Sequence, residues 1–143
     1  MGTFKAIILL IALGAVVSGA FAAGDKNSPH VNYMLHCQGC HLPKGIGHPG
    51  LVPKLTDHVG KFLSVEGGRA YLIQVPGVAQ SNLDDETLAE VLNWLIPTFD
   101  PVNTPDNFAP FTAKEIGTFR PTRIRAVSEI RQKLLNDYRS TNN

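Results

Sequence analysis

Two cysteines and the histidine behind them constrain this chain more than any other feature of its sequence. Cys37 and Cys40 are the only cysteines, and His41 follows the second directly. C-x-x-C-H is the attachment pattern for c-type haem. Each thiol would form a thioether with one vinyl group of the porphyrin, and His41 would bind the iron. The motif therefore predicts a fold built around one covalently bound haem c.

Three other uses of the two cysteines compete with haem. A redox dithiol is expected beside alternating strands and helices, and no such alternation is visible. A zinc site would draw on the five histidines, but no H-x₃₋₅-H pair follows at the usual interval. A plain disulfide would suit an oxidising compartment. The histidine after Cys40 and the absence of further cysteines favour haem; the histidines are His30, His36, His41, His48 and His58.

The first residues are typical of a secretory leader. Lys5 is the only charge before an apolar run from Ala6 to Val17, and small residues with the pattern Ala20-x-Ala22 follow. A positive start, an apolar stretch and an A-x-A site predict a signal peptide over residues 1–22. We therefore expect export across the inner membrane to the periplasm. Membrane attachment is expected only if the leader stays uncleaved.

Charge and composition exclude some partners. Thirteen Lys and Arg stand against twelve Asp and Glu, so no basic surface for nucleic acid is indicated. The chain is 43% hydrophobic and 17% charged, which is ordinary for a globular domain.

The segment Asn27 to Leu55 resembles the class I cytochrome c family. Tyr33 stands four residues before Cys37, where the family keeps an aromatic residue, and Pro29 stands where it usually has Gly. Pro53-Lys54-Leu55 falls where the family has Pro-x-Leu. By this resemblance Pro53 and Leu55 contact the haem, and the Pro53 carbonyl accepts a hydrogen bond from His41 Nδ1.

Helix signals extend over most of the remaining chain, so we expect an all-α fold. Ser28 with Pro29 begins a helix that leads into the cysteines. Glu66 to Val75 and Asp84 to Ile96 are two more helices, each closed by a proline. The predicted cytochrome c-like haem domain spans residues 23–97.

Residues 98–143 form an extension that a minimal haem domain does not need. A Pro-rich loop is expected from Pro97 to Phe111, and Thr112 with Glu115 forms a capping box for a short helix ending at Phe119. An amphipathic helix is expected over Thr122 to Tyr138. We expect this helix to pack back on the haem domain; a docking arm is the alternative.

The sixth iron ligand departs from the resembling family, which usually has a methionine before its last helix. The corresponding loop, Val75 to Asn82, has none, and Met34 is expected in the core. His58 is the first choice because it is the only histidine beyond Pro53. Three alternatives remain. The sixth position of the iron is open or bound by water, it is occupied by Gln80, or it is occupied by a group from another chain.

The resemblance implies an electron carrier rather than an enzyme. It would move single electrons between periplasmic redox partners, such as a dehydrogenase and an oxidase. The missing methionine keeps a second function open, in which an unusual distal site binds small ligands or the chain is fixed within a larger redox assembly. The sequence leaves the oligomeric state open.

Overall fold

The computed structural model describes residues 27–142 as a bundle of helices joined by ordered loops. The predicted leader and its cleavage site lie outside the described residues. Within residues 27–142 no strand forms, and His48 and Val52 make an isolated bridge. The expected all-α class is therefore confirmed. No helix in this part of the chain has the length and apolar character needed to span a membrane.

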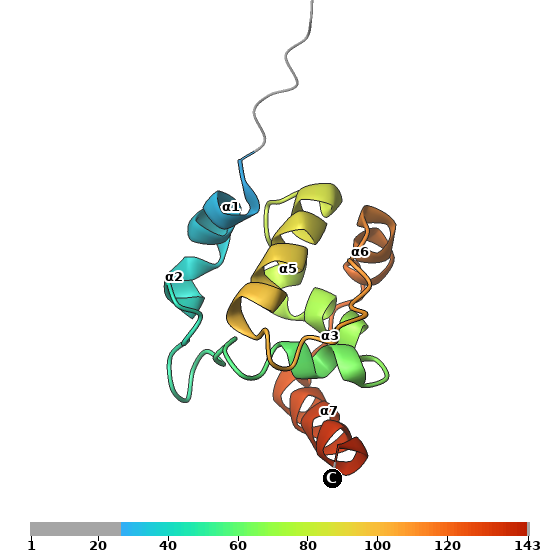
Figure 1. Cartoon of the computed structure of the whole chain (residues 1–143). Helices are drawn as coiled ribbons and strands as arrows, with labels where there is room; N and C mark the ends of the chain where they lie inside the picture. Colours follow the sequence, from blue (N-terminus) through green and yellow to red (C-terminus); the bar gives the residue numbers. More distant parts are fainter. Residues whose placement is uncertain (1–26, 143) are drawn as a thin grey trace, which may run out of the picture.

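The first described part of the chain forms two short helices that carry the cysteine motif. Helix α1 spans Pro29–His36, and α2 spans Gln38–His41. Ser28 caps α1 as predicted, since its hydroxyl accepts a hydrogen bond from the Val31 N–H at 3.4 Å. Helix α1 packs along α5, which spans Asp85–Phe99 and runs through the middle of the molecule (Figure 1).

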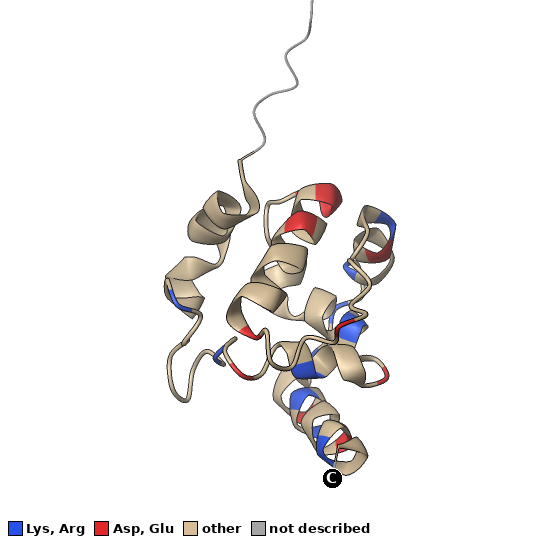
Figure 2. Ribbon diagram, in the orientation of Figure 1, with Lys and Arg blue, Asp and Glu red and all other residues tan. Residues whose placement is uncertain are grey.

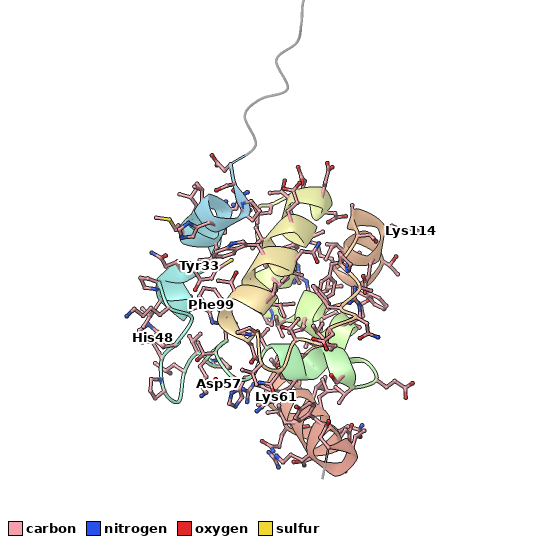
Figure 3. The ribbon with its side chains drawn as sticks, viewed as in Figure 1. Tyr33, His48, Asp57, Lys61, Phe99 and Lys114 are labelled. Atoms are coloured by element: carbon pink, nitrogen blue, oxygen red, sulfur yellow. The ribbon has the colours of Figure 1, made fainter. Side chains whose placement is uncertain are left out.

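Aromatic rings join α1 to α5. The Tyr33 side chain is fully buried, and its ring centroid lies 5.0 Å from that of Phe99 and 5.6 Å from that of Trp94. Figure 3 shows Tyr33 and Phe99 pointing toward each other between the two helices. The Tyr33 hydroxyl donates to the Leu42 carbonyl at 2.6 Å, directly after the cysteine motif. One side chain therefore ties the motif to the central helix.

Helix α5 is longer than the sequence predicted. Asp84 caps it as expected, accepting from the Thr87 N–H at 2.7 Å. Pro97 does not end the helix, which continues to Phe99. Proline lacks an N–H and so removes one helical hydrogen bond, but the next turn still forms, with the Asp100 N–H donating to Ile96 at 2.9 Å. The prediction of an end at Ile96 was wrong because that single lost bond lies in the last turn.

A group of short helices lies beside α5. They are the 3₁₀ helix η2 (Gly60–Ser64), α3 (Gly68–Gln74) and α4 (Pro76–Ala79). Pro76 ends α3 as predicted but also begins α4, because proline fits the first position of a helix. The loop expected between residues 75 and 82 is thus partly helical.

The extension packs back on the bundle. Helix α6 spans Ala113–Phe119 and packs against α5, and α7 spans Val127–Thr141 and packs against η2 and α3. Thr112 caps α6 as predicted. The other half of the capping box does not form, because both Glu115 carboxylate oxygens accept hydrogen bonds from Arg69, each at 2.7 Å. The amphipathic helix begins later than expected, at Val127.

Candidate functional site

A largely apolar cavity of about 400 Å³ opens beside the cysteine motif. Its volume lies in the range of about 300–1,000 Å³ typical of small-molecule and cofactor sites. Cys37, Cys40 and His41 form one side of it, and Pro53 and Leu55 lie on the loop that follows. Five of the six residues predicted from the sequence therefore line one cavity.

Helix α2 and the loop after it position these groups. The His41 N–H donates to the Cys37 carbonyl at 3.0 Å, so the motif forms a single helical turn. The loop then folds back: the Gly47 N–H donates to the His41 carbonyl at 3.0 Å, and the Leu55 N–H to Gly45 at 2.7 Å. Gly47 has φ +62°, and a Cβ there would lie 2.4 Å from the Val52 carbonyl oxygen. Only glycine allows the loop to return Pro53 and Leu55 to the cavity.

The His41 ring has one buried and unpartnered nitrogen. Nδ1 is enclosed and makes no hydrogen bond of normal geometry. Burial lowers the pKa of His41, and the nearby Pro53 carbonyl acts in the opposite direction. A lowered pKa favours the neutral imidazole, which is the form that binds metal ions.

The two thiols differ in their surroundings. Cys37 is partly buried and Cys40 is exposed, and neither forms a disulfide in the described part of the chain. Burial, with a smaller contribution from Cys40, raises the pKa of Cys37 to about 11. Redox C-x-x-C pairs depend on a lowered thiol pKa, so this environment does not suit a dithiol catalyst.

The same residues do not suit a zinc site. Within residues 27–142 no three side chains among His, Cys, Asp and Glu come close enough to hold a metal ion. His30 instead packs on Trp94, with ring centroids 5.2 Å apart, and His48 belongs to the return loop. Two thiols, one imidazole and an apolar chamber do match what a covalently bound haem c requires.

His58 lies outside this group. It is not among the residues that line the cavity, and its Nδ1 lies 3.3 Å from the Thr56 carbonyl oxygen. Burial lowers the pKa of its ring, and nearby cations lower it further. Iron ligation by His58 would require the turn between Leu55 and Val59 to move toward the cavity, and it stays a prediction.

Gln80, the other residue named as a possible sixth ligand, is also absent from the cavity wall. Met34 was expected in the core, but this residue of α1 is 48% exposed to solvent. Neither Met34 nor Gln80 lines the cavity. Helices α3 and α4, with the residue between them, contribute Tyr71, Leu72, Val75, Pro76, Gly77 and Val78. Of these only Tyr71 carries a side-chain heteroatom.

Sequence reasoning missed the contribution of the extension to the cavity. Val127 and Arg131 line it from α7, and both come from the region assigned to a separate extension. Residues four apart share one face of a helix, so their spacing could have placed Arg131 beside the apolar Val127. It could not show that this face meets the cavity.

Two proteins of established identity resemble this chain, and no family model matches it. Both are cytochromes c-552 from Thermus thermophilus. Each is 36% identical over an alignment of length 106, and the match covers 62% of this chain and 81% or 72% of the relative. The matched length, the helical fold and the cavity beside the C-x-x-C-H turn agree with one another. The chain therefore belongs to the class I mono-haem c-type cytochromes, electron-transfer proteins with covalently bound haem c.

Proposed function

We propose that this protein is an exported electron carrier in which Cys37 and Cys40 attach the haem and His41 binds its iron. The observation that carries the proposal is the convergence of both cysteines, His41, Pro53 and Leu55 on one apolar cavity. The leader predicted over residues 1–22 supports a place in the periplasm. There the protein would pass single electrons between redox partner proteins, such as a dehydrogenase and an oxidase.

The haem supplies the reversible one-electron change, and the chain controls its surroundings. The Pro53 carbonyl opposes the lowering of the His41 pKa by burial, and a hydrogen bond from Nδ1 to this carbonyl would orient the ring and increase its basicity. Valine, leucine and phenylalanine side chains on the cavity wall exclude water. A dry site with fixed dipoles is one of the means by which a protein sets the potential of its haem.

The proposed site has an edge at the molecular surface where an electron can leave. Cys40 is exposed, and Leu51 lines the cavity while 86% of its surface remains accessible. Residues 28–43, which include α1 and α2, contain no Lys, Arg, Asp or Glu (Figure 2). A partner that approaches α1 and α2 would therefore meet apolar and neutral polar groups, and the lysines nearest to it are Lys44 and Lys54 on the loop that follows.

Haem attachment tests the proposal directly. Replacing both Cys37 and Cys40 by Ala should abolish covalent haem, because no other thiol is present in the sequence. The measurement is haem-peroxidase staining of a denaturing gel, and Gln38→Ala is the control inside the same turn. A stained band from the double variant would contradict the assignment.

A second function, the binding of small neutral ligands at the iron, is favoured by one observation. The lining residues from α3 and α4 include neither methionine nor histidine. If the iron has an open position, the reduced wild-type protein will bind carbon monoxide readily. If His58 occupies that position instead, only His58→Ala will bind carbon monoxide, while the control His48→Ala will behave like wild type. Absorption spectra with and without the gas distinguish these outcomes.

A further inference from the structure

The cavity contains cationic side chains but no anionic ones. Lys54 and Arg131 line it, whereas no aspartate or glutamate does. Lys54 already has a partner, because its Nζ lies 3.0 Å from the Asp57 carboxylate. Arg131 makes no hydrogen bond or ion pair with any residue between positions 27 and 142. An unpaired cation thus lies at the edge of an apolar chamber.

The position of Arg131 makes this lack of a partner significant. The residue is half-buried on α7, one turn beyond Val127, and both side chains reach the cavity. Its positive charge acts on Tyr71, another lining residue, where it opposes the effect of burial on the pKa of the phenol. Partial burial of an unpaired charge is unfavourable unless a bound group compensates it.

Haem c carries two propionate carboxylates, which are the groups that such a cation would bind. A guanidinium matches a carboxylate in geometry and can donate two parallel hydrogen bonds. We propose that Arg131 binds a haem propionate and thereby makes helix α7 of the extension part of the cofactor site. This inference rests on the proposed attachment of haem at Cys37 and Cys40.

The proposal gives the extension a role beyond covering the bundle. Helix α7, which carries the buried Leu134 and Leu135, already contacts η2 and α3. Hydrogen bonds from Arg131 to a haem propionate would connect α7 to the cofactor, and this connection would exist only in the haem-loaded protein. The same hydrogen bonds would place a positive charge near the iron, which disfavours the oxidised form and raises the reduction potential.

The test compares haem-loaded Arg131→Gln with Arg139→Gln in the full chain. Arg139 is the matched control because it lies on the same helix, is exposed, and donates a hydrogen bond to Asn136 at 2.9 Å. Arg131→Gln should lower the reduction potential and shift the propionate bending band in the resonance Raman spectrum. Amide exchange across α7 should become about tenfold faster, as expected for loss of a charge-assisted hydrogen bond. Arg139→Gln should change none of the three, and Arg131→Lys should retain most of the potential.

The outcomes separate this inference from the function on which it rests. Wild-type protein without covalent haem would overturn both. Wild-type protein with haem, but with the same potential and Raman band in Arg131→Gln as in Arg139→Gln, would overturn the role of Arg131 alone. If Arg131→Gln loads too little haem to measure, Arg131→Lys decides: its Raman band must differ from wild type, because a lysine cannot reproduce the two-pronged contact.

Discussion

Arg120 offers the sharpest test of how the extension holds the loop before α5. It follows α6, and its guanidinium reaches back about forty residues along the sequence. Nε donates to the Ala79 carbonyl at 3.0 Å, and one terminal nitrogen donates to the Leu83 carbonyl at 2.8 Å and to Asp85 Oδ1 at 2.9 Å. The other donates to Ser81. The loop between α4 and α5 is thus fixed by one side chain.

The expected effect of Arg120→Ala follows from the number and exposure of these bonds. The Arg120 side chain is 18% exposed and that of Asp85 is 39% exposed, so water can replace part of what is lost. If each of the four residues that accept from Arg120 loses about 0.5–1 kcal/mol, the free energy of unfolding should fall by about 2–4 kcal/mol. Arg120→Lys should lower the free energy of unfolding by less, because it keeps the positive charge opposite Asp85.

Urea unfolding of the haem-loaded protein, followed by circular dichroism, measures this difference. Arg123→Ala is the control, since Arg123 is exposed, lines the same surface hollow and makes no hydrogen bond within the described residues. A change within about 0.5 kcal/mol is expected for such a surface substitution. If Arg120→Ala unfolds at the same urea concentration as Arg123→Ala, the reasoning is refuted.

Two further substitutions test packing near the cavity. Gly68→Ala should lower the free energy of unfolding by about 3 kcal/mol or more, because the new Cβ would lie 1.8 Å from the Phe62 carbonyl oxygen, which is backbone and cannot turn aside. Gly39→Ala, with no atom within 4 Å of its Cβ, is its control in the same unfolding assay, and equal stability of the two variants would contradict the clash. Tyr33→Phe should lower stability by about 1 kcal/mol, because the buried ring stays while the Leu42 carbonyl loses its donor. Tyr138→Phe, which loses a longer bond of 3.2 Å to Asn103, should change less in thermal unfolding, and the reverse order would count against the argument.

Local chemistry explains what could be predicted from the sequence. The C-x-x-C-H turn needs only the spacing of its residues. The caps at Ser28, Asp84 and Thr112 each depend on an N–H three residues away, so neighbours in the sequence suffice to define them. The return of Pro53 to the site was implied by resemblance, and the loop glycines that permit it are visible in the sequence.

Contacts between distant residues decided the rest. Glu115 was assigned to its own helix cap, but Arg69, 46 residues earlier, binds both of its carboxylate oxygens. A bidentate, partly buried ion pair outcompetes a local bond to a backbone N–H. Arg131 reaches the cavity, and His58 does not, because of how α7 and the turn after Leu55 pack. No periodicity within either segment encodes that packing, so tertiary structure alone determined which charged side chain reaches the site.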